Sequence, residues 1–144
     1  MRTTEENILA APCGLYCGDC VAYIAKDDPV LLDALITKGL NKDQLPCPGC
    51  RLGKGACPAI NCECATYACV DGRGLDFCFE CPEFPCDKLI PAADMAAALP
   101  HNIKIFNLCY IKQHGLSSWL EKAHEIRQKY FCGKMIVGKG PELK

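Results

Sequence analysis

Residues 13–20 read Cys-Gly-Leu-Tyr-Cys-Gly-Asp-Cys, a C-x₃-C-x₂-C arrangement that sets the pattern for the first two-thirds of the chain. Residues 47–50, Cys-Pro-Gly-Cys, repeat the C-x₂-C spacing, and residues 78–86, Cys-Phe-Glu-Cys-Pro-Glu-Phe-Pro-Cys, form a C-x₂-C-x₄-C unit. Two thiolates separated by two residues in a turn both reach one cation at ~2.3 Å. Three such pairs in one short chain therefore predict metal binding.

Cysteine is concentrated at one end of the chain and histidine at the other. The 144 residues contain 14 cysteines, and all three histidines follow the cysteine-rich part. We therefore expect thiolate-only Cys₄ sites for Zn²⁺, which are closed and structural. Two or three ions fit the count, and three is preferred because twelve cysteines fill three such sites. The candidate ligands are Cys13, Cys17, Cys20, Cys47, Cys50, Cys57, Cys62, Cys64, Cys69, Cys78, Cys81 and Cys86.

The N-terminus and the charge balance bear on compartment and partners. Residues 1–7 are polar and acidic, and the apolar stretch that follows ends at Pro12, too short for a signal-peptide core. No apolar run approaches the ~20 residues of a membrane span. We expect a cytoplasmic protein, in which thiols stay reduced and bind metal. Lys plus Arg (16) and Asp plus Glu (17) nearly cancel, so no overall basic field attracts nucleic acid.

The distribution of turn-forming and helix-forming residues predicts the fold class and the domains. We expect a mainly α, small, metal-stabilised fold, in which short helices and cysteine knuckles surround the zinc sites and a helical C-terminal tail follows. The predicted parts are a cysteine-rich metal-binding domain over residues 12–90, a helical extension packing on it over 91–132, and a flexible tail over 133–144. Residues 45–88 hold few large aliphatic side chains, so the first part should be unfolded without metal.

Four helices are predicted from local signals. Asp28-Pro29 is a good helix start, and Gly39 a good end. An alanine-rich helix is expected over residues 94–99. The next helix, from residue 102, should end at Gly115 and bury the face that carries its cysteine. The last should begin at Ser118, which forms a capping box with the glutamate three residues later. Each of the last two helices has one shared face, and Cys109, Trp119 and Tyr130 are expected to lie in the core. The residues on these faces are Ile103, Phe106, Cys109, Tyr110 and His114, and then Trp119, Leu120, Ala123, Ile126, Arg127 and Tyr130.

Three segments together resemble a known family. Cys-Gly-Leu-Tyr-Cys-Gly-Asp-Cys, Cys-Pro-Gly-Cys-Arg at 47–51 and Cys-Phe-Glu-Cys-Pro-Glu-Phe-Pro-Cys-Asp-Lys-Leu at 78–89 resemble the cysteine-rich domain of unknown function 3795, over roughly residues 12–90. The resemblance implies metal binding and no particular reaction. Cys57 and Cys62 fall where the family spacing varies. Some relatives end in a Cys-x₂-Cys-Gly motif. Here only Cys132-Gly133 matches it, because Lys129 occupies the position of its first cysteine. The matching positions are Cys13, Cys17, Cys20, Cys47, Cys50, Cys64, Cys69, Cys78, Cys81 and Cys86.

Other metal chemistries remain open from the sequence. An iron–sulfur protein in electron transfer is the first alternative, although a ferredoxin has C-x₂-C-x₂-C-x₃-C-P and only Cys81-Pro82 resembles its end. The chain is too short for the barrel that accompanies a radical-SAM triad. Metal storage or delivery is the second alternative, since Cys62-Glu63-Cys64 has a metallothionein-like spacing. A disulfide scaffold is the third, because some thermophile cytosols are rich in disulfides.

The sequence favours a scaffold or interaction module over an enzyme. Cys17, near a helix start, is the one candidate for a reactive thiol, and no histidine or carboxylate is positioned by spacing to assist it. A protein partner is compatible with the sequence. The basic residues after Lys122 are better explained as a solvated helix face than as a nucleic-acid site. The histidines, His101, His114 and His124, are expected to be surface or capping groups.

Overall fold

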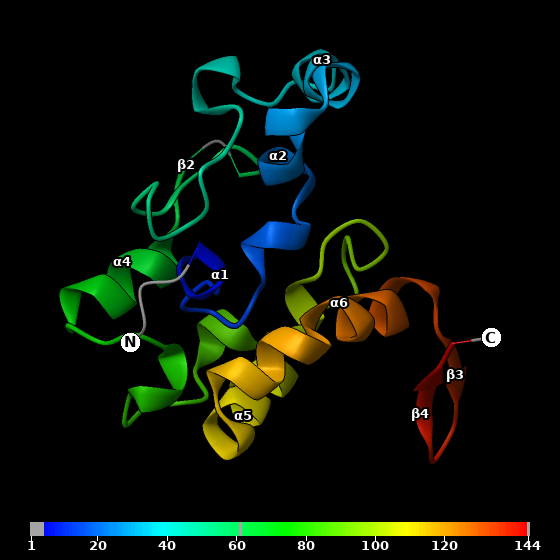
Figure 1. Ribbon diagram of the computed structural model, residues 1–144. Coiled ribbons are helices and arrows are strands. Elements are labelled where there is room, and N and C mark those ends of the chain that lie inside the picture. The colour runs from blue at the N-terminus through cyan, green and yellow to red at the C-terminus, as the bar shows by residue number, and fades with distance from the viewer. Residues whose placement is uncertain (1–4, 61, 144) are drawn as a thin grey trace.

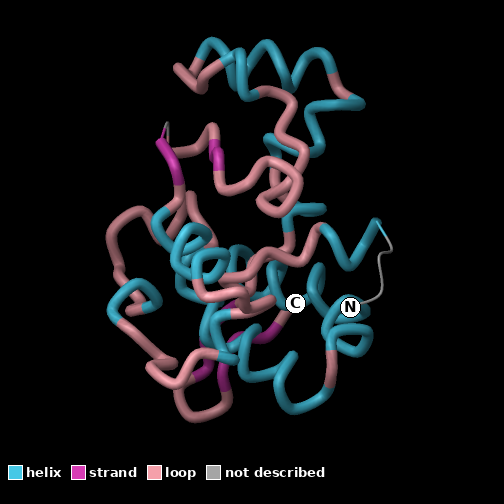
Figure 2. The backbone as a smooth tube through the Cα atoms, turned by 90° about the vertical axis from the view of Figure 1, so that its left-hand side faces the viewer, coloured by secondary structure: helices cyan, strands magenta, loops and turns pink. Residues whose placement is uncertain are grey.

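The computed structural model describes residues 5–60 and 62–143. Short helices dominate the regular structure, and the strands are short (Figures 1 and 2). The α-helices are α1 (Glu5–Ile8), α2 (Val21–Ile24), α3 (Pro29–Thr37), α4 (Ala65–Gly72), α5 (Lys104–His114) and α6 (Leu116–Cys132). The 3₁₀ turns are η1 (Cys17–Asp19), η2 (Ala25–Asp27), η3 (Lys42–Gln44), η4 (Cys78–Glu80), η5 (Asp87–Leu89) and η6 (His101–Ile103). The strands are β1 (Ala56–Cys57), β2 (Cys62–Glu63), β3 (Lys134–Ile136) and β4 (Gly140–Glu142). The expected fold class, mainly α with short helices and a C-terminal helix, is confirmed.

The two ends of the molecule are built differently. α3 lies at one end, above α2, while α5 and α6 pack against each other at the opposite end (Figures 1 and 2). Turns and 3₁₀ segments that carry most of the cysteines fill the space between them. β1 and β2 pair antiparallel within this middle part, with Cys57 opposite Cys62.

A core cluster joins residues from both sides of position 90. Trp119 and Leu108 are fully buried, and the ring of Trp119 meets Tyr16 edge to face at 6.0 Å. The cysteine-rich part supplies apolar side chains to the same cluster. Its buried members are Ala10, Val70, Phe77, Cys78, Leu89, Leu108, Ile111, Trp119 and Ala123. The helical pair thus covers a cysteine-rich part that has few large side chains of its own.

The helix boundaries agree with the local signals at α3 and differ at α6. The Asp28 side chain accepts a hydrogen bond from the Leu31 N–H at 3.0 Å, as expected of a helix cap, and Gly39 follows α3 at φ +97°. α6 begins at Leu116, two residues before the predicted Ser118, so that prediction is wrong. The reason is Gly115, whose φ of +89° lets one residue end α5 and start α6. The face of α6 expected to be buried is confirmed, with Trp119 and Ala123 at its centre.

Two other local predictions are wrong. Residues 94–99 form turns and no helix, because Met95 has φ +58° and its carbonyl accepts from both Ala98 and Leu99. α5 is rotated from its expected orientation, since Cys109 and Phe106 are exposed. The buried face carries Asn107, Leu108 and Ile111 instead. The Asn107 amide, on this same face, donates to the Gly14 carbonyl at 2.7 Å.

The end of the chain, expected to be a flexible tail, contains a hairpin. β3 pairs antiparallel with β4, with Lys134 opposite Glu142 and Met135 opposite Pro141. Gly138, at φ +89°, lies in the turn between the two strands, and Gly140, also at positive φ, begins β4 opposite Ile136. The hairpin follows α6 and extends away from the cysteine-rich part (Figure 1).

The orientation of α5 gives a test by substitution. Leu108→Ala should reduce the free energy of unfolding by ~2–5 kcal/mol, because a fully buried side chain is removed from the shared core. Cys109→Ala, one residue further on the same helix, should change it by about 0.5 kcal/mol or less. Denaturant unfolding of both variants and the parent chain, at equal metal content, measures the difference. Equal losses for the two variants would contradict the orientation.

Candidate metal centre

The cysteines gather into two clusters. The first consists of Cys17, Cys20, Cys47 and Cys50, from η1 and the Cys-Pro-Gly-Cys knuckle, with Cys57 beside it. The second consists of Cys69 of α4, Cys78 at the start of η4, Cys81 directly after η4, and Cys86, which line one pocket. Cys13 lies near both clusters, since its charge acts on Cys50 and on Cys78. All fourteen cysteines fall in the described ranges and are free thiols.

In the first cluster, two knuckles meet directly. The Cys50 N–H points at the Cys17 sulfur at 3.4 Å, across 33 residues of sequence. Gly49 lies close to Cys17 and Leu9. A Cβ added at Gly49 would lie 3.6 Å from Cys17 Cβ and 3.2 Å from Leu9 Cδ2. A further hydrogen bond, from the Cys47 N–H to the Ala22 carbonyl at 2.8 Å, ties the second knuckle to α2. The chain thus holds the two C-x₂-C pairs face to face.

Cys17 and Cys50 have opposite ionisation tendencies. Hydrogen bonding from the Cys50 side chain and N–H, together with the charge of Arg51, lowers the pKa of the Cys17 thiol to about 7 although burial opposes this. The pKa of Cys50 is raised, because its thiol hydrogen-bonds to Cys17 and burial disfavours its charged form. Near neutral pH the Cys17 thiolate is therefore favoured, whereas Cys50 stays protonated. A bound cation would be needed to ionise both.

Arg51 connects the first cluster to the rest of the fold. Its Nε donates to the Ala10 carbonyl at 2.7 Å and its Nη2 to the Asp76 carbonyl at 2.8 Å. The guanidinium lies 4.9 Å from the centre of the Phe77 ring, within cation–π distance. The residue directly after the Cys-Pro-Gly-Cys knuckle therefore joins segments that are distant in sequence.

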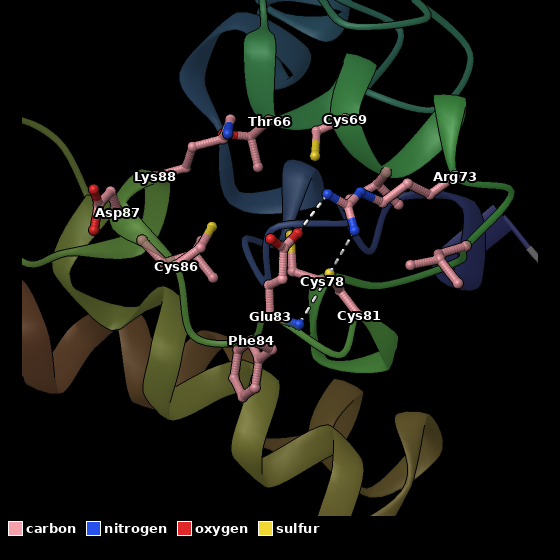
Figure 3. Close-up of a pocket in the computed structure, with 13 residues that line it drawn as sticks. Thr66, Cys69, Arg73, Cys78, Cys81, Glu83, Phe84, Cys86, Asp87 and Lys88 are labelled. Atoms are coloured by element: carbon pink, nitrogen blue, oxygen red, sulfur yellow. Dashed lines mark hydrogen bonds and ion pairs between the residues drawn. The ribbon is translucent and has the colours of Figure 1, made fainter.

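The second cluster lines a pocket of ≈ 490 Å³ (Figure 3). The Cys81 sulfur accepts hydrogen bonds from Arg73 Nη1 at 3.2 Å and from the Glu83 N–H at 3.4 Å. Arg73 also pairs with the Glu83 carboxylate, and Figure 3 shows these two side chains directed toward each other between Cys69 and Cys81. N–H donors directed at a sulfur are a usual accompaniment of thiolate ligands.

Burial and mutual repulsion disfavour thiolates in both clusters. Burial raises the pKa of Cys78 to about 12, and the charges of Cys13, Cys86 and Cys69 add to the effect. Burial likewise raises the pKa of Cys47 and of Cys57, again with neighbouring cysteines contributing. A divalent cation offsets both causes, because its charge stabilises every thiolate around it. The electrostatics therefore fit a bound cation.

The placement of the sulfurs falls short of a formed site. Within residues 5–60 and 62–143, no three or more His, Cys, Asp or Glu side chains form a group that could hold a metal ion as they stand. Of the twelve candidates, eight belong to the two clusters. Cys13 and Cys57 flank the first cluster, Cys64 lies near both of them, and Cys62 is exposed on β2.

Residues that spacing did not single out also contribute to the clusters. Arg73 and Glu83 frame Cys81, and Arg51 lies next to Cys17. Arg51 and Glu83 belong to the segments that resemble the family, whereas Arg73 lies outside them. The sequence signals were the position of Arg51 directly after the knuckle and that of Glu83 within the 78–86 unit. His124 contacts the carboxylate of Asp19, a residue of the first knuckle, at 3.1 Å. The two residues are 105 positions apart, so no local pattern could have found this pair.

Among the described residues, no helix is long and apolar enough to cross a membrane.

Comparison with known proteins gives one match. The family model described as "Protein of unknown function (DUF3795)" matches residues 9–91, a range that contains both clusters. No curated protein matches the chain. No solved structure matches it either.

The contact between the two knuckles gives a second prediction. Gly49→Ala should reduce the free energy of unfolding by about 1 kcal/mol more than Gly39→Ala, because its Cβ would lie 3.2 Å from Leu9 Cδ2, which must shift. The two glycines have nearly the same φ, +99° and +97°, and a Cβ at Gly39 has nothing within 4 Å, so Gly39→Ala measures backbone strain alone. Denaturant unfolding checks this. Equal losses would contradict the close packing of Gly49 on Leu9.

Proposed function

Because the chain belongs to the DUF3795 family of proteins of unknown function, which supplies no reaction to carry over, we propose from its own residues that it is a zinc-binding structural protein. Zn²⁺ is held by thiolates at two centres, one in each cysteine cluster. The helical segment after residue 90 packs on the metal-bound part. The whole serves as a scaffold for a protein partner.

The observation that carries the proposal is the convergence of four cysteines on one pocket. Cys69 comes from α4, and Cys78, Cys81 and Cys86 come from the C-x₂-C-x₄-C unit at residues 78–86. The pocket lining includes no histidine. Two N–H groups already point at the Cys81 sulfur. An all-thiolate set with N–H donors to sulfur suits Zn²⁺, which takes four sulfur ligands at ~2.3 Å.

A zinc ion would supply the positive charge that stabilises these thiols in their ionised form. The raised pKa of Cys78 and of Cys47 comes from burial and from neighbouring thiolates, and a dication reverses both effects. Metal uptake is expected to release protons and to draw the four sulfurs of a cluster together. The free energy of such binding, ~10 kcal/mol or more, is comparable to the net stability of a domain.

A scaffold role follows from the closed ligand sets. Four thiolates leave no coordination position for water or substrate, so the metal supports the fold and does not catalyse a reaction. Partner recognition then falls to exposed apolar side chains beside the clusters and on the helical pair. Ile90 and Phe106 are 63% and 58% exposed and are the candidates for such contacts.

Metal content tests the two centres separately. Elemental analysis of the purified chain should give one zinc per cluster. After dialysis against a competing chelator, Cys81→Ser and Cys20→Ser should each lower the zinc content by about one ion per chain relative to the parent, because loss of one of four thiolate ligands weakens zinc binding. Cys109→Ser and Cys132→Ser, both at exposed positions, are the matched controls and should leave the content unchanged.

Three results would contradict this assignment. Iron in the purified chain, together with the visible absorption of an iron–sulfur cluster, would indicate an electron-transfer protein in place of a zinc protein. A third zinc would require Cys13, Cys57, Cys62 and Cys64 to form a site of their own. Absence of metal together with oxidised thiols would favour disulfides.

Metal removal should unfold the cysteine-rich part, and the single tryptophan reports it. Trp119 is fully buried against Tyr16 and the shared core, so its emission should shift toward that of an exposed indole when a strong chelator removes zinc. Restoring zinc under reducing conditions should reverse the shift. Unchanged emission after complete zinc loss would show that the core does not depend on metal.

A further inference from the structure

A small internal pocket lies where the first cysteine knuckle meets the helical pair. It is lined by Asp19 of η1, Asn107 of α5 and Trp119 of α6, together with Tyr16 and Arg127. This pocket is separate from both cysteine clusters. It contains no thiol and lies on the side of η1 that faces α5 and α6.

Three buried polar atoms on this lining are unpaired. Asp19 Oδ2, Asn107 Oδ1 and Trp119 Nε1 have no hydrogen-bond partner within the part of the chain that the structure describes. Asn107 is 2% exposed and Trp119 is 0% exposed. Buried polar groups are almost always satisfied by protein or by ordered water. Three unpaired atoms on one small pocket therefore point to a common partner.

The chemistry of the three atoms identifies that partner. Asn107 donates through Nδ2 to the Gly14 carbonyl, which leaves its buried Oδ1 as an unpaired acceptor. Asp19 Oδ1 is bound to His124, which leaves Oδ2 as a second acceptor. Trp119 Nε1 is a donor only. Two acceptors and one donor match a single water molecule, which donates twice and accepts once. A metal cation does not fit, because the indole N–H would point at it.

The size of the pocket agrees with one water. The space in which the centre of a water molecule fits is ≈ 10 Å³. This is about what one buried water needs, and buried waters make on the order of three hydrogen bonds. The Arg127 guanidinium lies 5.1 Å from the centre of the Phe131 ring and makes no hydrogen bond to Asp19 among the described residues.

We propose that one buried water joins Asp19, Asn107 and Trp119, and so links the Cys17–Cys20 knuckle to both helices of the helical pair. Asp19 lies between two members of the first cysteine cluster. The water therefore positions that knuckle against α5 and α6, and the helical segment becomes part of the support of the first cluster. The proposal does not depend on which metal, if any, the cysteines bind.

Nuclear magnetic resonance on the intact, folded chain tests the proposal. The chain has one tryptophan, so a single indole N–H signal belongs to Trp119. A long-lived water at hydrogen-bond distance should give a cross peak between this proton and water whose sign differs between laboratory-frame and rotating-frame experiments. Simple proton exchange gives the same sign in both. A peak of exchange type only, or no peak, would overturn the proposal.

Two controls keep the result specific. Tyr16→Phe removes the hydroxyl of another lining residue, and the cross peak should persist, since its loss would trace the signal to Tyr16 instead. A high-resolution crystal structure of the unaltered chain should show one water within hydrogen-bond distance of Asp19 Oδ2, Asn107 Oδ1 and Trp119 Nε1. A direct hydrogen bond from Trp119 Nε1 to Asp19 Oδ2, with the pocket closed, would overturn the proposal.

Discussion

The shortage of large apolar side chains between residues 45 and 88 is the constraint on which the rest of the structure depends. The few that this segment buries, such as Val70 and Phe77, do not form a core of their own. They enter a cluster whose largest member, Trp119, comes from α6. A segment with so little burial gains too little hydrophobic free energy to offset its conformational entropy alone. The helical pair and the proposed metal centres supply the remainder in complementary ways.

The two cysteine clusters differ in their surroundings. The first is compact, since one knuckle packs on the other through Gly49 and Cys17, and Arg51 ties it to distant backbone carbonyls. The second opens on a pocket whose lining includes the paired Arg73 and Glu83. A metal in the first cluster would be enclosed by backbone and apolar side chains, whereas one in the second would lie beside charged groups and solvent. The second is therefore the centre at which metal exchange should be faster.

The connection between the cysteine-rich part and the helices is polar as well as apolar. Asn107 reaches the Gly14 carbonyl, and His124 reaches Asp19, so both helices contact the segment that bears the first knuckle. These hydrogen bonds are directional and fix orientation, which apolar packing alone does not. The rotation of α5 agrees with one of them: its sequence offers two apolar faces, and the Asn107 bond lies on the one with Leu108 and Ile111.

The sequence by itself determined the class of fold, the family and the cysteines available for chemistry, because these depend on composition, local spacing and short-range signals such as the Asp28 cap. Only the tertiary structure decided which cysteines share a cluster, which face of α5 is buried, and where α6 begins. Those features rest on contacts such as Cys17 with Cys50 and Asp19 with His124, whose partners lie 33 and 105 residues apart. Spacing along the chain carries no information on which distant segments meet, because that depends on how the whole chain packs.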